Sequence, residues 1–285
     1  MPLPACSGVN PHEYPSVRIL AVITDAKSVR PCLDAAVMAA RIDPYSHIAG
    51  LHVVGDPDRL VAPSEEVQFQ RLRERTEGTA RDKAKAVEAE FLCWNVGADE
   101  RTPRITWEAP VGAEEEMIVR AAQNADLLVL VQGHDMDSGD ARHAAIREAG
   151  KPLLLLPANW KARSERFAHI AVALSDTPIA ADAIDAALPW LQAAETVTAL
   201  RIGSEDDPAL ALADRVRTAG IDVDMRIIPP ESDDRGAQIV HEAKSIGADL
   251  LVAGAYRHGL LVEWLLGGTT RHMLAAAELP LFLVH

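Results

Sequence analysis

The sequence predicts an α/β protein made of two similar halves, each a five-stranded parallel sheet with helices on both faces. Two observations support this fold class. Short apolar segments alternate with amphipathic helical segments along the chain of 285 residues. Ala, Val and Leu predominate, while aromatic residues make up only 4% of the sequence. This composition is typical of parallel strands that are buried on both faces.

An internal repeat divides the chain into two halves. The segment ILAVITD at residues 19–25 recurs as IAVALSD at residues 170–176, and ADLLV at residues 125–129 recurs at residues 248–252. The apolar ends of the halves also match, with KPLLLL at residues 151–156 and LPLFLV at residues 279–284. Because the motifs keep their order, they indicate a duplication. We expect an N-terminal tail at residues 1–15 and domains at residues 16–158 and 167–285.

Each half is expected to contain five strands. These strands cover residues 18–24, 47–53, 104–108, 126–131 and 153–156 in the first half, and residues 170–174, 196–202, 222–227, 249–253 and 281–284 in the second. Helices are expected at residues 29–41, 65–94, 113–124, 141–149, 180–192, 208–219, 234–246 and 270–276.

The composition argues against several kinds of partner. The formal charge of −14 would repel a nucleic acid backbone. No apolar segment approaches membrane-spanning length, and residues 1–14 lack the apolar core of a signal peptide. Cys6, Cys32 and Cys93 form an odd, scattered set that fits a reducing compartment better than a disulfide framework. We therefore expect a soluble, cytoplasmic protein that binds neither nucleic acid nor membrane.

The C-terminal region contains the most informative motif. The strand expected at residues 249–253 ends at Gly254, and Gly267 and Gly268 precede the helix expected at residues 270–276. A strand followed by two glycine turns and a helix can direct backbone N–H groups toward a phosphate. The glycines alone are equally consistent with an ordinary connection between a strand and a helix.

These motifs together make the chain similar to the universal stress proteins, as two such domains fused in tandem. The resemblance covers both halves and rests on the aspartate after the first strand, on ADLL before the fourth, and above all on residues 254–284. It implies Rossmann-like domains of the adenine nucleotide alpha hydrolase-like type, a role in the stress response, and ATP or AMP as the ligand.

The resemblance also implies how the halves meet. In single-domain relatives two protomers pair through their last strands, so the segments at residues 153–156 and 281–284 are expected to pair within this chain as an intramolecular pseudo-dimer. Both segments are apolar enough to be costly as open sheet edges.

The glycine pattern of nucleotide-binding relatives is only partly kept. That pattern is Gly, two residues, Gly, nine residues, Gly and then Ser or Thr. Gly254 and Gly267 fit it, whereas Arg257 replaces the second glycine and Gly268 replaces the hydroxyl residue, with Thr269 one position later. The Arg257 side chain either obstructs the phosphates or pairs with them as a bidentate donor. Both outcomes remain open from the sequence.

Asp176 and Ile202 complete the expected ligand site of the second half. Asp176 follows the first strand of that half, at the edge where open α/β sheets bind ligands. The resemblance implies that Asp176 accepts hydrogen bonds from the base or ribose and that Ile202 lines the base pocket. Alternatively, Asp176 caps the next helix, which Thr177 and Pro178 favour, and the two roles are compatible.

The first half lacks a comparable glycine loop. Asp126 and Pro152 are 26 positions apart, against 31 for Asp249 and Pro280, and the intervening loop is acidic. Because acids repel phosphate, we expect no nucleotide in this half, although Asp25 is kept. The same loop mixes residue types that ligate metals, but a solvated loop is favoured and no metal site is predicted. Its residues of this kind are His134, Asp135, Asp137, Asp140 and His143.

No residue pattern indicates a catalytic centre. None of His258, His272 and His285 lies in a pattern with a Ser or Cys nucleophile and a paired acid, so we expect no enzyme. The leading hypothesis is a binding and regulatory stress protein that holds ATP or AMP in its second half. The alternatives are a nucleotide-free interaction module acting through an unidentified protein partner, and a slow ATP hydrolase. A homodimer is also compatible with the sequence.

Overall fold

The computed structural model describes residues 16–55, 68, 71–72, 75, 78–97, 102–133, 141, 144–145, 149–204, 208–231, 235–254 and 279–284. Its strands are β1 (Arg18–Val22), β2 (His47–Leu51), β3 (Arg104–Glu108), β4 (Leu127–Val131), β5 (Leu153–Leu156), β6 (His169–Ala173), β7 (Thr196–Ile202), β8 (Asp224–Ile228), β9 (Leu250–Gly254) and β10 (Leu281–Val284). Its helices are α1 (Ala26–Ala40), α3 (Ala80–Val96), α4 (Glu114–Ala122), α6 (Pro178–Ala193), α7 (Ala211–Thr218) and α8 (Arg235–Ser245), with a short 3-10 helix at Pro208–Leu210.

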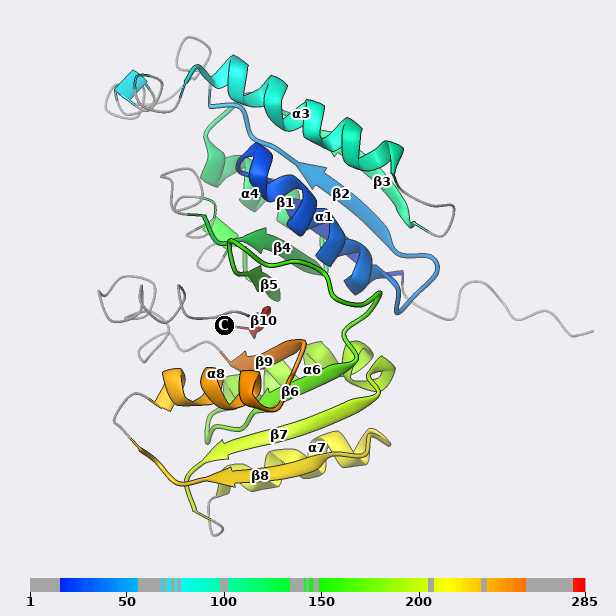
Figure 1. Cartoon of the computed structure of the whole chain (residues 1–285), viewed down its shortest axis with the longest axis vertical. Coiled ribbons are helices and arrows are strands. Elements are labelled where there is room, and N and C mark those ends of the chain that lie inside the picture. The colour runs from blue at the N-terminus through cyan, green and yellow to red at the C-terminus, as the bar shows by residue number, and fades with distance from the viewer. Residues whose placement is uncertain are drawn as a thin grey trace, which may run out of the picture.

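All the strands join in one ten-stranded sheet with the order β3-β2-β1-β4-β5-β10-β9-β6-β7-β8 (Figure 1). Each half therefore contributes five neighbouring strands, and the second half repeats the order of the first in mirror image. Strand pairs within a half are parallel. The predicted fold class, two α/β halves with parallel sheets, is confirmed.

The halves meet at the pair β5/β10, which is antiparallel. Leu281 lies opposite Leu155, and Leu283 lies opposite Leu153. The two apolar strands that would be costly as open edges therefore cover each other, as the sequence predicts. Because this pair is antiparallel, the ten strands form two parallel sheets joined edge to edge. The strand direction reverses at the junction between β5 and β10.

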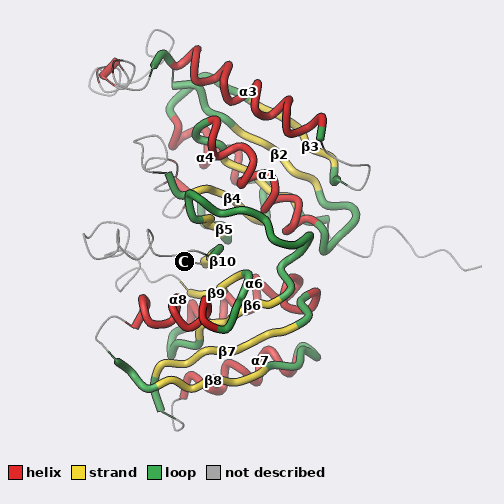
Figure 2. The backbone as a smooth tube through the Cα atoms, in the orientation of Figure 1, coloured by secondary structure: helices red, strands yellow, loops and turns green. Residues whose placement is uncertain are grey.

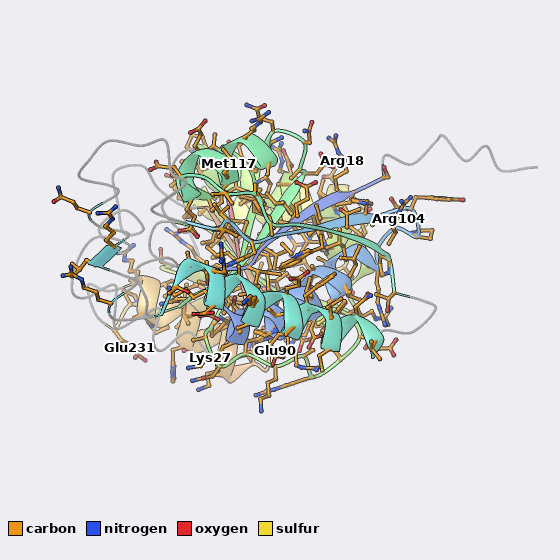
Figure 3. The ribbon with its side chains drawn as sticks, turned by 90° about the horizontal axis from the view of Figure 1, so that it is seen from above. Arg18, Lys27, Glu90, Arg104, Met117 and Glu231 are labelled. Atoms are coloured by element: carbon orange, nitrogen blue, oxygen red, sulfur yellow. The ribbon has the colours of Figure 1, made fainter. Side chains whose placement is uncertain are left out.

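Helices cover both faces of this sheet (Figure 2). One face carries a continuous apolar cluster that includes residues of α1, α3, α6 and α7, and the other carries a cluster that includes residues of α4 and α8. Viewed from above, α3 with Glu90 and α4 with Met117 lie on opposite sides of the first half (Figure 3). Within the described ranges, no helix is both long enough and apolar enough to cross a bilayer.

The helix predicted at residues 65–94 is interrupted rather than continuous: residues 68, 71–72 and 75 are helical, and a break at residues 78–79 separates them from α3. Helix α3 begins only at Ala80, because Gly78 adopts a positive φ of 90° and Thr79 caps the helix, its hydroxyl accepting a hydrogen bond from Asp82 N at 3.1 Å. A glycine in this conformation interrupts a helical backbone. The helix predicted at residues 208–219 likewise divides into the 3-10 helix and α7. The helix predicted at residues 141–149 lies largely outside the described residues, and that at 270–276 wholly outside them.

The repeated ADLLV motif has the same structural task in both halves. In the first half, Asp126 Oδ2 accepts a hydrogen bond from Arg18 N at 2.9 Å. In the second, Asp249 Oδ2 accepts from His169 N at 2.9 Å. Each aspartate thereby joins the beginning of the fourth strand of its half to the beginning of the first. The motif sets the register of the strand pairs β1/β4 and β6/β9.

Candidate functional site

The candidate site lies at the carboxyl ends of the strands of the second half. Strand β6 ends at Ala173, and four residues, 174–177, lead into α6. Thr177 is the N-cap: its Oγ1 accepts a hydrogen bond from Ala180 N at 3.3 Å, and Pro178 follows as the first helical residue. The alternative in which Asp176 caps this helix is therefore wrong, because the connection places Thr177 at the capping position.

Asp176 itself is exposed beside the first turn of α6. Within the described part of the chain, no residue is hydrogen-bonded to its carboxylate. The equivalent Asp25 of the first half has a different environment, because only three residues connect β1 with α1. Asp25 is the N-cap of α1, and its Oδ1 accepts a hydrogen bond from Ser28 N at 2.8 Å. One additional residue in the second half thus separates this aspartate from the capping position.

Gly254, the last residue of β9, lies directly against the first turn of α6. A Cβ atom at this position would lie 2.8 Å from Ala180 N and 2.8 Å from the carbonyl carbon of Ile179. Such distances are shorter than any van der Waals contact, so only glycine allows β9 and α6 to approach this closely. The contact brings the end of β9 beside the loop that carries Asp176.

Ile202 and Arg201 end the neighbouring strand β7. Ile202 is buried, and the next residue continues the strand pairing with a hydrogen bond from Gly203 N to Ile228 O at 2.9 Å. Arg201 Nη1 donates to the carbonyl oxygen of Leu174 at 3.0 Å, which holds the guanidinium beside the loop before Asp176. Sequence reasoning missed Arg201. The sequence feature that could have indicated Arg201 is its charge, because the rest of the strand segment TVTALRI is uncharged.

The structure thus brings three predicted site residues, Asp176, Ile202 and Gly254, to one edge of the sheet. The other four, Arg257, Gly267, Gly268 and Thr269, lie outside the described residues, as does the entire segment 255–278. Their role in binding phosphate remains a prediction.

The carboxyl ends of the first-half strands also carry buried polar side chains. His52 follows β2, and its Nδ1 is hydrogen-bonded to Ile23 O at 2.9 Å. Gln132 follows β4 and is also buried. The acidic loop at residues 134–140 and His143 lie outside the described residues. Where the chain is described, no group of three or more His, Cys, Asp or Glu side chains gathers in a way that suits a metal ion.

Two of the three cysteines lie in the described helices. Cys32 is fully buried in α1, with its thiol 3.4 Å from Val129 O, and burial raises the pKa of this thiol. A thiol in such surroundings stays protonated, so Cys32 is an inert core residue. Cys93 is exposed on α3.

Comparison with known proteins relates the whole chain to one fold. No protein-family model and no curated protein matches the sequence. A universal stress protein from Archaeoglobus fulgidus DSM 4304 is similar in structure, with a TM-score of 0.60 and 14% identity over 94% of this chain and 95% of that one. A protein of unknown function from Pseudomonas aeruginosa PAO1 has a TM-score of 0.55 and 16% identity, over 94% of this chain and 92% of that chain.

A candidate universal stress protein from Pseudomonas aeruginosa UCBPP-PA14 has a TM-score of 0.50 and 15% identity, again over 94% of this chain and 92% of that one. These similarities extend over both halves. The chain therefore has the fold of the universal stress proteins over nearly its whole length.

Proposed function

We propose that this protein is a binding and regulatory member of the universal stress proteins that acts in the cytoplasm and holds ATP or AMP in its second half. The first half, at residues 16–158, serves as the pseudo-dimer partner of the second, at residues 167–285. The observation that carries this proposal is the difference between two equivalent aspartates. Asp25 caps a helix, whereas Asp176 is exposed and leaves capping to Thr177.

The surroundings of Asp176 support a ligand role. Its loop lies between the end of β7, with Ile202, and the end of β9, where Gly254 touches the first turn of α6. Open α/β sheets bind ligands outside the carboxyl ends of such strands, at the point where the strand order reverses. Here β6 lies between β7 on one side and β9 on the other, so the strand order reverses at β6. A carboxylate at this point suits a ligand that donates hydrogen bonds, such as a ribose or a base.

The two aspartates offer a matched test in the full-length protein. We expect calorimetric titration to show binding of ATP or AMP, and Asp176→Ala to weaken it by at least about tenfold, because a hydrogen bond to a charged group is lost. Asp176→Ala should leave the melting temperature unchanged. Asp25→Ala should do the opposite: it removes a helix cap, which costs about 0.5–2 kcal/mol, and leaves nucleotide affinity unchanged.

Other outcomes would favour the alternative functions. If the full-length protein binds neither nucleotide, the proposal is wrong and a nucleotide-free interaction module becomes the better hypothesis. If bound ATP is converted to ADP with release of phosphate, the protein is a slow hydrolase. Equal effects of the two alanine variants on affinity would show that Asp176 is not a ligand residue.

A further inference from the structure

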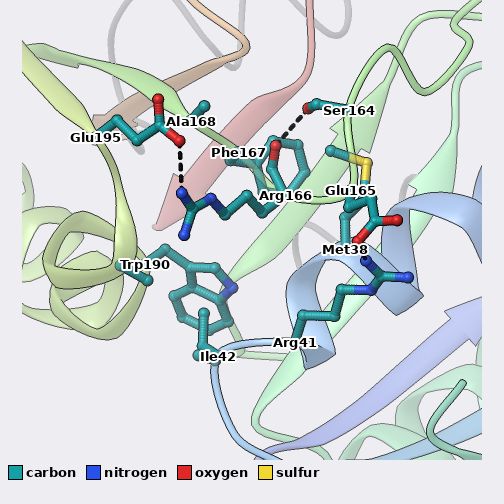
Figure 4. A pocket seen from close by; sticks show the side chains of 11 residues that line it. Met38, Arg41, Ile42, Ser164, Glu165, Arg166, Phe167, Ala168, Trp190 and Glu195 are labelled. Atoms are coloured by element: carbon teal, nitrogen blue, oxygen red, sulfur yellow. Dashed lines mark hydrogen bonds and ion pairs between the residues drawn. The ribbon is translucent and has the colours of Figure 1, made fainter. Parts of the chain in front are cut away.

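A cavity lies where the two halves meet, beside the amino ends of β6 and β7, whereas the candidate nucleotide site lies at the carboxyl ends of these strands (Figure 4). Helices α1 and α6 begin at the carboxyl ends of the strands and end here, beside the residues that precede β6 and β7. We call this space the seam cavity. Its lining residues are Met38, Arg41, Ile42, Ser164, Glu165, Arg166, Phe167, Ala168, Trp190, Ala193 and Glu195.

The seam cavity has the size of a small-molecule site. Its volume is about 630 Å³, within the range of about 300–1,000 Å³ that is usual for ligand pockets. Both halves and the segment between them contribute to its lining. Pockets at such junctions between domains commonly hold ligands.

The floor of the seam cavity is apolar, and its Trp190 side chain is held by specific contacts. Met38, Phe167 and Trp190 form much of it, and all three are largely buried. The Trp190 indole is fixed by a hydrogen bond to Ala39 O at 3.0 Å and by contact with the ring of Phe282. This floor offers an apolar surface to the body of a ligand without needing to rearrange.

The rim of the seam cavity carries two ion pairs, Arg41–Glu165 and Arg166–Glu195 (Figure 4). In the first pair the carboxylate is much the more accessible partner, with Glu165 67% exposed and Arg41 27%, whereas in the second pair Glu195 and Arg166 are similarly exposed, at 63% and 55%. An incoming group therefore meets the Glu165 carboxylate more readily than the Arg41 guanidinium, and both members of the second pair are open to it.

The two helices that end at the seam cavity add negative potential. A helix carries partial negative charge at its C-terminus, where the last carbonyl groups lack helical partners. Both α1 and α6 lie wholly within the described ranges. Neither helix has a basic residue in its last turn, and Arg41, the C-cap residue of α1, is paired with Glu165. The arginines and glutamates of the rim balance in formal charge, so the partial charges of the two helix ends shift the balance toward negative. The net charge of −14 acts in the same direction.

We propose that the seam cavity binds a small organic cation, an ammonium group on an apolar body. The apolar body covers the floor formed by Phe167 and Trp190, and the ammonium group lies at the rim with the glutamate carboxylates and the carbonyl ends of α1 and α6. This site is separate from the nucleotide site, since it lies beside the amino ends of β6 and β7 and the nucleotide site lies at their carboxyl ends.

Three matched probes test the charge preference in the full-length protein by ligand-observed NMR titration. They are phenethylammonium, 3-phenylpropionate and 2-phenylethanol, which share an aromatic body and differ in charge. We expect phenethylammonium to bind, and the anion and the neutral alcohol to bind at least about fivefold more weakly, the effect of one accessible ion pair. Tighter binding of the anion, or no binding of the cation, would overturn the proposal.

Variants of one rim pair should act in opposite directions. Glu195→Gln removes a carboxylate and should lower the affinity for phenethylammonium about threefold to fivefold. Arg166→Gln releases Glu195 from its ion pair and should raise this affinity by a similar factor. Asp214→Asn, which removes an exposed ion pair with Arg217 on α7, is the control and should change nothing. Weaker binding in both rim variants would contradict the proposal, because it would indicate a general loss of structure.

A substitution that fills the cavity locates the site. Ala193 lines the cavity at the end of α6, and Ala193→Phe should reduce binding by at least about tenfold, because the added ring occupies the space of the ligand. Circular dichroism and the melting temperature should match the unsubstituted protein. Unchanged binding in a folded Ala193→Phe variant would place the cation elsewhere and refute the proposal.

Discussion

Trp190 Nε1 donates a hydrogen bond to the carbonyl oxygen of Ala39 at 3.0 Å, joining residues that are 151 positions apart. Ala39 lies in the last turn of α1, where carbonyl groups have no helical partner, so the indole satisfies a group that would otherwise be left unpaired. The same ring contacts Phe282 of β10, with 5.3 Å between the ring centres. The two halves are thus held together by a helix contact as well as by the strand pair β5/β10.

Replacement of Trp190 should therefore weaken the junction of the halves. Trp190→Phe keeps an aromatic side chain but leaves the buried Ala39 carbonyl without its donor, at a cost of about 1–3 kcal/mol in the free energy of unfolding. Urea denaturation measures this cost. Trp94→Phe is the control within one half, because the Trp94 indole donates to Asp34 Oδ1 at 2.8 Å. We expect only Trp190→Phe to separate the unfolding transitions of the halves. A single unchanged transition would contradict this role of Trp190.

Gly254→Ala should destabilise the second half. The added Cβ would lie 2.8 Å from Ala180 N, so β9 or the first turn of α6 must move, which costs about 1–3 kcal/mol. The free energy of unfolding measures the effect. Gly97→Ala is a suitable control, because its nearest contact would be Trp94 O at 3.4 Å and its φ of −85° is open to any residue. Equal stability of the two variants would show that the close approach of β9 and α6 is unimportant.

Asp126 should contribute a pH-dependent share of stability. Partial burial acts to raise the pKa of Asp126, but its hydrogen bonds and ion pair with Arg18 outweigh burial and hold the pKa below its ordinary value. A carboxyl group with a lowered pKa in the folded state stabilises the protein above its unfolded pKa of about 4, and this contribution disappears as the pH falls through the folded pKa.

The variant Asp126→Asn tests this dependence. At pH 7 it should lower the free energy of unfolding by no more than about 1 kcal/mol, because the side chain is 42% exposed and solvent screens the ion pair. The difference from the unsubstituted protein should shrink as the pH is lowered below about 4. Denaturation curves at pH 7, 5 and 3 provide the measurement. A difference that grows toward low pH would have the wrong sign.

Arg257→Gly should decide how the altered glycine pattern affects nucleotide binding. We expect tighter ATP binding, because the sequence places the arginine where nucleotide-binding relatives have a glycine, and a side chain there occupies space needed by the phosphates. If the arginine pairs with the phosphates instead, affinity should fall about tenfold to a hundredfold, the effect of losing a charge-assisted hydrogen bond. Calorimetry distinguishes the two cases, and unchanged affinity would refute both.

The apolar pattern of the sequence predicts most of the strands. Four of them, β3, β5, β7 and β10, have the predicted bounds. Strand β1 ends at Val22, two residues earlier than predicted, because helix α1 already begins at Ala26 with Asp25 as its N-cap. Alternation and apolar runs are local properties, so they identify strands, but the place where the chain turns depends on single capping residues.

The sequence by itself determined the α/β class, the two similar halves, and the presence of Asp176, Ile202 and Gly254 at the carboxyl ends of strands. Only the tertiary structure decided that Thr177 rather than Asp176 caps α6, that Gly254 touches the backbone of Ile179 and Ala180, and that α1 and α6 enclose the seam cavity. The repeat fixes the order of elements within each half, because each strand pairs with neighbours from its own half. Contacts between α1 and α6 depend instead on how β5 meets β10, and this antiparallel register leaves no periodic signal along the chain.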